Sequence, residues 1–466
     1  MKIQFLGAAR EVTGSKHLIT LDNGKTILLD CGLFQGKGEE TENMNRNPGY
    51  NPANIDYIIL SHAHIDHSGA IPYIINNGFK GSIISTHATR ELCAILLPDS
   101  GRIHENDTKT NNKKRAKQGL PPVEPLYTHR DAEKSMQYFI SIPYNKEFYV
   151  DEGVKLTYTD AGHILGSAVV NLKIKENNKI TRLCFTGDIG RAYNKILRSP
   201  QAFPQADILI AESTYGDRLH SNIDVAEKEL KLVVLEACIK KKGKLIIPSF
   251  SVGRTQELLY TLNRLSNNGS IPYVKVFVDS PLSVNATNIM KLHTECFNDE
   301  ILEFMRTDPD PFGFNGLRYI QTEEDSKSLN NIKEPCIIIS ASGMMEAGRV
   351  KHHLANSISD KKNTVLVVGY CSPTTLGARI KRGDKEVSIY GVKHEVNADI
   401  KIIESFSAHG DYMEMINFLK YQDPKQVQQL FLVHGEYETQ LTYRDKLIKE
   451  GFTNIEIPEK GKEFVL

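Results

Sequence analysis

The stretch SHAHIDHSGA (61–70) limits what this chain can fold into more than any other segment. It directly follows a mostly apolar run, IDYIIL (55–60), which is typical of a buried strand. Its four strong metal ligands are His62, His64, Asp66 and His67. Side chains with this spacing cannot all face one side of a regular helix or strand. The pattern therefore predicts a buried strand that ends in an irregular turn, on which the four side chains converge.

Imidazole and carboxylate ligands together suit zinc or a similar borderline metal. Four ligands are too many for one open catalytic zinc and too few for two, so we expect two metal ions about 3.5–4 Å apart and further ligands elsewhere. The candidates are His163 in DAGHILGSA, Asp188 in FTGDIG and His434 in FLVHGE, each on a turn after a strand-like run. Taken singly, a His or Asp in such a place is more typical of a cap or turn residue.

Residues 1–206 contain short strand-like runs separated by tight turns. The first three runs are MKIQFLG, HLITL and KTILLD. After the histidine cluster, SGAIPYIINNG predicts a helix with Ser68 as its N-cap and Gly78 just beyond its end. This part of the chain is therefore expected to form sheets with short connections.

The rhythm changes between residues 207 and 390. Five strand-like runs occupy this segment, in order DILIAES, KLIIPSF, VKVFVDS, CIIISAS and TVLVVGY. Several are followed by helix-like stretches such as VGRTQELLYTLNRL, and this alternation favours a mainly parallel, Rossmann-like sheet. The last part returns to strand, helix and strand. We therefore expect an α/β chain with three segments, 1–206, 207–390 and 391–466, of which the middle one is a separate domain.

Composition excludes several other classes of protein. The formal net charge is +0, so no global basic field attracts nucleic acid and any such surface must be local. The seven cysteines include no C-x-x-C pair, which argues against a thiolate zinc site and a disulfide framework. No apolar run reaches the length of a membrane span, and the start, MKIQFLGAAREVTG, has too short an apolar run for a signal peptide. We expect a cytoplasmic protein without a membrane partner.

The most basic segment is KTNNKKRAKQG (109–119), which carries five basic residues. Two interpretations stay open at this point. The segment is either a solvated loop or a basic lip beside a site for polyanions.

Weaker anion-binding candidates lie in the second domain. In PSFSVGRTQE (248–257) a strand leads into a helix, whose free backbone N–H groups and Arg254 suit an anion. An ordinary Ser-capped helix explains the same pattern equally well. Four more polar residues complete the candidate substrate-binding set: Ser249, Arg349, Arg379 and Ser407. Arg379 stands in a glycine-rich turn, and for Arg349 a solvated helix face is the other interpretation.

Several of these segments resemble the motifs of a known family. HAHIDH matches the H-x-H-x-D-H motif of the metallo-β-lactamase fold superfamily, and Asp30, His163 and Asp188 fall, in order, where that superfamily has its other motifs. The second half resembles motifs A, B and C of the β-CASP branch, which contains nucleases acting on RNA and DNA. The three motifs are LIAESTYG with Glu212, SFSAHGDY with His409 and LFLVHGE with His434. The resemblance implies a metallo-β-lactamase αββα sandwich with an inserted Rossmann-like β-CASP domain.

The resemblance also implies two zinc ions per chain and a ligand set for each. It assigns the seven ligands as follows: His62, His64 and His163 to one zinc, Asp66, His67 and His434 to the other, and Asp188 between them. Asp30 is implied to orient ligands from behind. All seven positions carry the expected residue types, which indicates an active site rather than a vestigial one. The same ligands also accept iron or manganese.

The activity implied is hydrolysis of phosphodiester bonds in single-stranded RNA. A zinc-bridging hydroxide would attack the phosphorus, and His409, kept cationic by Glu212, would protonate the leaving oxygen. Asp66 completes the implied catalytic set. The histidine at motif C, His434, is typical of the RNA-type members of the branch.

Two other readings are carried alongside this one. The first is a small-substrate metallo-hydrolase, such as a thioesterase or lactonase on the same metal fold. The second is a non-catalytic RNA-binding subunit of a processing complex, although such subunits usually lack some of the ligands. Homodimer formation is compatible with the sequence under every reading.

Overall fold

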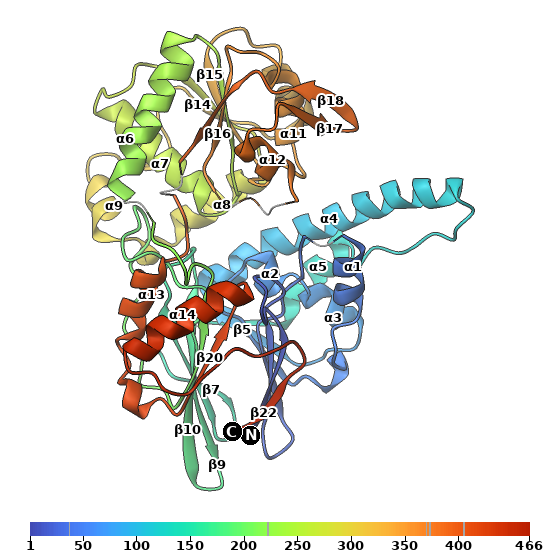
Figure 1. Cartoon of the computed structure of the whole chain (residues 1–466), viewed down its shortest axis with the longest axis vertical. Helices are drawn as coiled ribbons and strands as arrows, with labels where there is room; N and C mark the ends of the chain where they lie inside the picture. The colour runs from blue at the N-terminus through green and yellow to red at the C-terminus, as the bar shows by residue number, and fades with distance from the viewer. Residues whose placement is uncertain (37, 221–222, 370, 372–373, 404–405) are drawn as a thin grey trace. The chain divides into compact units, whose positions relative to one another are not determined.

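The computed structural model describes residues 1–36, 38–220, 223–369, 371, 374–403 and 406–466, and it divides into two compact units. Unit 1 consists of Met1–Ala192, Ser199–Leu219 and His409–Leu466, and unit 2 consists of Tyr193–Arg198 and His220–Ala408. Figure 1 shows the elements of both units in chain order. Within the described residues, no helix combines the length and the apolarity that crossing a membrane requires.

Unit 1 is built on two seven-stranded sheets. The first has the order β22 (Glu463–Val465), β1 (Lys2–Gly7), β2 (Lys16–Thr20), β3 (Thr26–Leu29), β4 (Tyr57–Ile59), β5 (Ser82–Thr86) and β6 (Phe139–Ile142). The second has the order β21 (Ile455–Glu456), β20 (Gln429–Val433), β11 (Ile208–Glu212), β10 (Lys179–Phe185), β9 (Ala168–Glu176), β8 (Val154–Asp160) and β7 (Phe148–Asp151).

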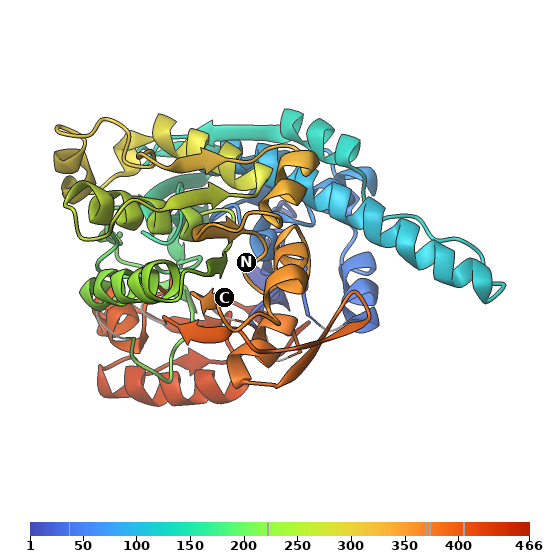
Figure 2. The same ribbon diagram turned by 90° about the horizontal axis from the view of Figure 1, so that it is seen from above.

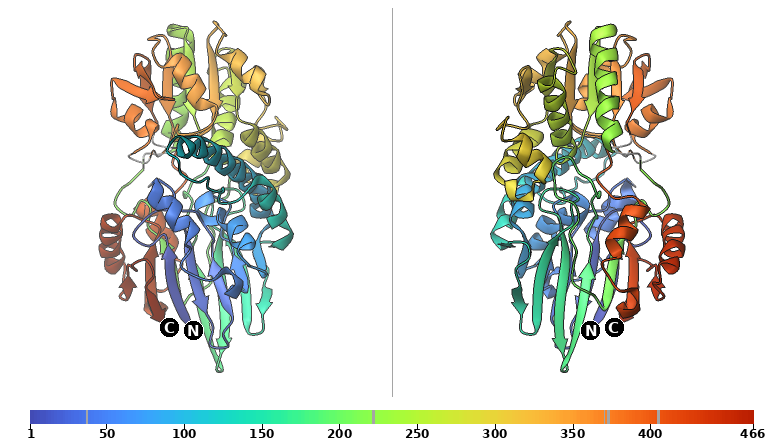
Figure 3. Two further views of the ribbon diagram at one scale, coloured as in Figure 1. Left: turned by 90° about the vertical axis from the view of Figure 1, so that its right-hand side faces the viewer. Right: turned by 90° about the vertical axis from the view of Figure 1, so that its left-hand side faces the viewer.

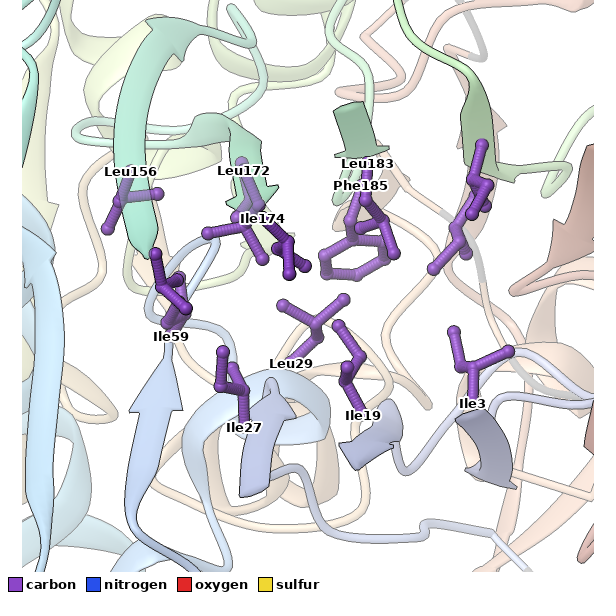
Figure 4. Packing of buried hydrophobic residues seen from close by; sticks show 14 of the residues in the cluster. Ile3, Ile19, Ile27, Leu29, Ile59, Leu156, Leu172, Ile174, Leu183 and Phe185 are labelled. Carbon is purple, nitrogen blue, oxygen red and sulfur yellow. The ribbon is translucent and has the colours of Figure 1, made fainter. Parts of the chain in front are cut away.

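The two sheets face each other across an apolar core. Figure 4 shows Ile27 and Leu29 of the first sheet opposite Leu172 and Phe185 of the second. Alternate residues of β1, β2 and β9 point into this layer, as a half-buried strand requires. This core fixes the register of both sheets, because a slip by one residue would turn each apolar set outward.

Helices cover the outer faces of the two sheets in unit 1, so the layers follow the predicted αββα order (Figure 1). The helices accompanying the first sheet are α1 (Glu39–Arg46), α2 (Ile65–Ser68), α3 (Ile71–Asn76), α4 (His87–Lys117) and α5 (His129–Ser135). Those packed on the second sheet are α13 (Tyr412–Leu419) and α14 (Tyr437–Lys449). The predicted α/β class and sandwich architecture are confirmed.

Strand direction brings the candidate ligands to one edge of each sheet. In the second sheet, β10, β11 and β20 are parallel, and β8 runs the same way because both β8 and β10 are antiparallel to β9. In the first sheet, β3 and β4 are parallel. Side chains that follow these strands therefore gather where the strands end, which is where α/β proteins commonly place their sites.

Unit 2 has a six-stranded, wholly parallel sheet, as the alternating pattern predicts. Its strand order is β14 (Leu317–Tyr319), β13 (Lys275–Val278), β15 (Cys336–Ser340), β12 (Lys244–Pro248), β16 (Thr364–Val367) and β19 (Asp399–Ile402). Its helices are α6 (Ile223–Val234), α7 (Arg254–Asn267), α8 (Pro281–Leu292), α9 (Asp299–Phe304), α10 (Glu323–Leu329), α11 (Val350–Ser357) and α12 (Leu376–Arg382). A hairpin of β17 (Glu386–Ile389) and β18 (Val392–Glu395) completes it.

The compact units do not follow the segment limits drawn from the sequence. The run DILIAES, assigned there to the second domain, forms β11, which pairs with β10 and β20 and so belongs to the second sheet of unit 1. Residues 391–408, assigned there to the last segment, lie in unit 2, because β19 pairs with β16. A strand belongs to the unit whose strands it pairs with. An apolar run in the sequence predicts a strand but not the strand with which it pairs. Tyr370 and Ser405, at the ends of two quoted runs, lie outside the described residues.

Two local predictions are wrong. Ser68 does not cap a helix: it ends α2, and its hydroxyl donates to the carbonyls of Ala63 and His64, while Ala70 is the N-cap of α3. The basic segment 109–119 is not a loop, because α4 continues through most of it to Lys117. Its lysines and arginine are good helix formers, so a polar composition did not exclude a helix.

The first and last strands of the chain are neighbours. β1 pairs with β22 in antiparallel fashion, with Lys2 opposite Val465. Figure 3 shows the two ends side by side in both views. Residues from both ends of the chain therefore complete one sheet of unit 1.

Candidate metal centre

The turn that carries the histidine cluster is held by its backbone. The carbonyls of residues 65, 66 and 67 accept hydrogen bonds from the N–H groups of residues 33, 15 and 31, at 2.9, 2.8 and 2.7 Å. Gly32 lies inside this contact, and a Cβ there would come within 1.6 Å of the Asp66 carbonyl oxygen. Only glycine therefore allows the two loops to approach so closely.

The first ligand set contains His62, His64, His163 and Asp188. The His64 Nδ1 atom lies 3.1 Å from His62 Nε2 and 3.2 Å from His163 Nε2. The Asp188 Oδ2 atom lies 3.4 Å from His62 Nε2 and 3.5 Å from His163 Nε2. His62 follows β4, His163 follows β8 and Asp188 follows β10, so three separate strands and α2's N-cap, His64, build this set.

The second set contains Asp66, His67 and His434. The two imidazole Nε2 atoms lie 3.2 Å apart, and Asp66 Oδ2 lies 3.5 Å from His434 Nε2. The second oxygen of Asp188, Oδ1, lies 3.3 Å from His67 Nε2. Asp188 thus presents one carboxylate oxygen to each set, which is the arrangement of a bridging ligand.

These residues fit divalent metal ions. Zinc bonds of about 2.0–2.1 Å in a tetrahedron place neighbouring ligand atoms about 3.3–3.4 Å apart, close to the separations of the first set. Mutual hydrogen bonds do not account for the contacts, because a neutral imidazole has one N–H and three ring nitrogens here approach one point. Within the described residues, the buried Oδ1 of Asp188 has no hydrogen-bond partner. A cation would satisfy all of these atoms.

Buried partners fix the ligand orientation of two histidines. Asp30 Oδ2 lies 2.7 Å from His67 Nδ1, and Asp30 also accepts hydrogen bonds from the N–H and hydroxyl of Ser61 and the hydroxyl of Ser15. The Ser61 hydroxyl lies 3.0 Å from His62 Nδ1. With both Nδ1 atoms engaged in this way, the Nε2 atoms are left to face the metal.

His434 is held in a similar way from the second sheet. Its Nδ1 atom lies 2.9 Å from the Thr214 hydroxyl, which leaves Nε2 towards Asp66 and His67. Its backbone adopts φ 53°, a left-handed conformation that is unfavourable for a non-glycine residue. The His434 N–H donates to the Ala8 carbonyl at 2.7 Å, which helps to hold this conformation. Strained backbone of this kind is common at functional sites.

Replacing Asp30 by alanine is expected to lower the affinity for metal by about 10–100-fold, because His67 loses the acceptor that orients it. Competition with a chromophoric chelator measures the change. Asp56→Ala is the matched control. Asp56 also accepts a backbone N–H, from Thr26, but it directly precedes β4, whereas Asp30 directly follows β3 and lies beside the ligands. Equal metal affinity in Asp30→Ala and the parent protein would contradict the orienting role.

The electrostatics keep most ligands in their metal-binding form. Burial lowers the pKa of His62 well below its usual value and that of His64 to about 4, so both rings are neutral. Burial alone would raise the pKa of Asp66, but the charges of His67 and His434 outweigh it and lower that pKa to about 2. The pKa of Asp188 is held well below its usual value by the surrounding histidines, against the effect of burial.

His67 differs from the other rings. Burial would lower its pKa, but Asp188, Asp30 and Asp66 outweigh burial and raise that pKa well above the usual value. Without metal, the His67 ring is therefore protonated on both nitrogens. Metal binding at the second set must displace the proton on Nε2.

Glu212 and His409 form a pair beside the first set. Glu212 ends β11, is buried, and lies with Oε1 3.2 Å from His409 Nδ1. The other ring nitrogen of His409, Nε2, lies 3.9 Å from Asp188 Oδ2. Burial would lower the pKa of His409, but the charges of Glu212 and Asp188 outweigh it and raise the pKa to about 9. His409 is thus a half-buried cation at neutral pH, with one N–H directed towards the ligand cluster.

Glu212 is better suited to hold His409 than to bind metal. Its carboxylate also lies within reach of Asp188 and His434, so a third ligand combination exists geometrically. However, Oε1 already accepts the Ile189 N–H as well as His409, and Oε2 accepts the Thr214 N–H at 3.3 Å. Few lone pairs remain for a cation.

The substrate-binding candidates lie in unit 2 and have internal partners. Arg254 is buried, ion-paired to Glu257 and placed over the Phe406 ring at 5.3 Å. The other two arginines pair with aspartates: Arg349 with Asp279 at 2.7 Å and Arg379 with Asp384 at 3.2 Å.

The two serines of this set differ in their surroundings. Ser249 is fully buried and accepts a hydrogen bond from the Thr255 hydroxyl. Ser407 lines a pocket of unit 2 together with Arg254 and Phe406. Contact of these five residues with substrate stays a prediction.

Three orienting residues were missed by reading the sequence. Ser61 directly precedes the predicted ligand His62, and Thr214 lies within the motif LIAESTYG. Their positions in the sequence could therefore have indicated both residues. Ser15 carries no such signal, because its contact with Asp30 arises only when β2 and β3 pair.

Comparison with known proteins finds three family models that match successive parts of the chain. They are the metallo-beta-lactamase superfamily at residues 12–249, the Beta-Casp domain at residues 255–380 and the Zn-dependent metallo-hydrolase RNA specificity domain at residues 393–458.

Curated relatives match over nearly the whole chain. A ribonuclease of Thermus thermophilus is 33% identical over 452 residues, which cover 97% of this chain and 97% of that protein. The transcription termination factor FttA of Methanocaldococcus jannaschii is 31% identical over 96% of this chain and 68% of its own length. Cleavage and polyadenylation specificity factor 73 of Drosophila melanogaster is 30% identical over 94% of this chain and 60% of its own length.

Proposed function

Because this chain belongs to the metallo-β-lactamase superfamily and to its β-CASP branch, we propose that it is a two-zinc ribonuclease acting on single-stranded RNA. The relatives support a metal-dependent RNA nuclease, and they do not favour a thioesterase, a lactonase or a subunit without activity. In this proposal the family's metal-binding part corresponds to unit 1 and its β-CASP part to unit 2.

The observation that carries the proposal is the position of His409. Its cationic ring lies between Glu212 and the carboxylate that joins the two ligand sets. A thioester or an activated lactone has a leaving group that departs without a strong acid, whereas the ribose oxygen of RNA must be protonated as it leaves. A half-buried imidazolium beside a complete ligand set is therefore better matched to phosphodiester hydrolysis.

The chemistry divides between the metals and the protein. When bound, two divalent metals supply an acidified water and positive charge for the phosphate oxygens. His409 donates the proton on Nε2 to the leaving oxygen, and Glu212 keeps the ring cationic and oriented for this step. Asp188, with one carboxylate oxygen towards each ligand set, would hold the two metals side by side.

The test is cleavage of an end-labelled single-stranded RNA by purified protein before and after chelation. We expect cleavage that leaves 5′-phosphate ends, loss of cleavage in the chelated protein, and recovery on adding zinc. Metal analysis should find close to two ions per chain; iron or manganese in their place would revise the metal only. Turnover of thioesters or lactones without RNA cleavage, or RNA binding without turnover in zinc-replete buffer, would contradict the proposal.

Two further expectations stay predictions from the sequence. They are a cytoplasmic location and the formation of a homodimer.

A further inference from the structure

The helix α4 starts at the metal centre and leaves it. The hydroxyls of Thr86, its N-cap, and of Thr89 both donate to the Gly166 carbonyl, at 2.7 and 2.9 Å. Gly166 belongs to the turn that carries His163, and a Cβ at Gly166 would come within 2.5 Å of the Thr89 nitrogen. The first turn of α4 is thus fastened directly to a ligand-bearing turn.

The other half of α4 has no core to pack against. Its buried residues end at Gly101, and none of residues 102–117, all of them described, is buried. Figures 1 and 2 show this half extending beyond α1 and α5 of the same unit. We name residues 102–126, the free half of α4 and the segment that returns from it, the arm.

The arm is nevertheless well ordered by its own contacts. The Asn112 side chain makes two hydrogen bonds of 2.9 Å with the backbone of Val123, one as donor and one as acceptor. Arg115 Nε donates to the Pro121 carbonyl at 2.8 Å. At the base, the Tyr127 hydroxyl donates to Ser100 at 2.8 Å. The returning segment is therefore clamped along the helix, and the arm is a stiff projection rather than a loose loop.

The outer part of the arm, residues 108–123, carries charge of one sign. Residues 108–123 contain five basic residues and no Asp or Glu, in a chain whose Lys+Arg and Asp+Glu totals are equal at 57. Lys109, Lys113, Lys114 and Lys117 are exposed, and within the described part of the chain they form no ion pair. By contrast, lysines such as Lys155 are paired with carboxylates elsewhere in unit 1.

The lysines are arranged as a stripe. Lys109, Lys113 and Lys117 are four residues apart, so their side chains follow one face of the helix over about 12 Å. Like charges at this spacing destabilise an isolated helix. The helix dipole offsets this effect only in the last turn, which Lys109 and Lys113 precede. The stripe therefore does not serve the stability of the helix, and its charge complements a polyanion.

We propose that the arm binds the phosphate backbone of the RNA substrate at a distance from the metal centre. The inference rests on the proposed ribonuclease function and adds to it a second contact with RNA. Twenty residues separate Thr89 from Lys109, which is at most about 30 Å along the helix. At about 3.4 Å per stacked nucleotide, roughly nine nucleotides span that distance. Only longer RNAs reach the metal centre and the arm together.

The test replaces Lys109, Lys113, Lys114 and Lys117 by glutamine, which keeps helix propensity and removes charge. For a 30-nucleotide RNA we expect KM to rise at least ~10-fold at low salt, with kcat unchanged. The slope of log affinity against log salt should fall by about 2–3, since each phosphate contact on a single strand contributes about 0.7. For a 6-nucleotide RNA, KM should not change. Circular dichroism checks that α4 is retained.

A matched control carries the same loss of charge outside the arm. Lys146, Lys175, Lys179 and Lys449 are exposed lysines of unit 1, and their replacement by glutamine should leave both RNAs unaffected. If the fourfold arm variant folds poorly, the pairs Lys109/Lys113 and Lys114/Lys117 are replaced separately. Each double variant should show about half the change in the slope of log affinity against log salt.

Two outcomes separate this inference from the proposed function. If the parent protein cleaves both RNAs and the arm variant matches it in KM and salt slope, the arm does not bind RNA, and an acidic protein partner becomes its occupant. If the parent protein cleaves neither RNA, the ribonuclease proposal itself fails.

Discussion

Replacing Asp66 and His67 together by alanine is expected to abolish RNA cleavage. The change removes two of the three ligands that belong to the second set alone, and it leaves His434 and one oxygen of Asp188 to hold a cation. The metal content should fall from close to two ions per chain to close to one, because the first set is intact. Atomic emission on dialysed protein gives the metal content, and end-labelled RNA gives the activity.

The control for this variant is His394→Ala with Glu395→Ala, an adjacent His–acid pair on β18 of unit 2. It should keep full metal content and full cleavage. Circular dichroism and the thermal midpoint establish that both variants are folded. Undiminished cleavage by the Asp66/His67 variant with only one ion per chain would rule out a two-metal mechanism. Undiminished cleavage with two ions per chain would instead contradict the assignment of these two ligands.

Replacing His409 by alanine is expected to reduce kcat on RNA by about 10²–10⁴, the usual contribution of a general acid. Metal content should stay close to two ions per chain, since the ring contributes no atom to either ligand set. A diester with a p-nitrophenolate leaving group separates an acid from a structural residue. That anion leaves without being protonated, so the variant should turn it over at nearly the parent rate.

Glu212→Gln tests the same step through pH. Removing the carboxylate takes away a charge that raises the pKa of His409, so the pKa falls and the acid loses its proton at lower pH. The alkaline limb of the pH–rate profile should therefore move to lower pH, and activity below that limb should be retained in part.

For the His409→Ala variant, loss of metal would show that the ring is a ligand instead of an acid.

The sequence predicts the part of the site that is local. Four ligands on one turn after an apolar run identify a metal centre, because their spacing has no other simple explanation. The pairing of Glu212 with His409 is different: 197 residues separate them, and their contact depends on β11 and the Gly190–His409 bridge. No periodicity encodes that meeting, and it was expected only because the motifs resemble a family.

The fold shows the same division between local and distant information. The parallel sheet of unit 2 follows from strands alternating with helices. The sheets to which β11 and β19 belong do not follow from the sequence, because a buried strand has the same apolar pattern in either sheet. The path of α4 was missed for a related reason. Its second half is polar on every face, and a helix without an apolar stripe gives no pattern to read.

The interruption of unit 1 by unit 2 orders events during synthesis of the chain. Six of the seven ligands, from His62 to Asp188, precede unit 2, and His434 follows it. The strand that directly precedes His434, β20, must still pair with β11 before the second set can close. During synthesis the second set therefore lacks one of its ligands until the whole of unit 2 has been translated.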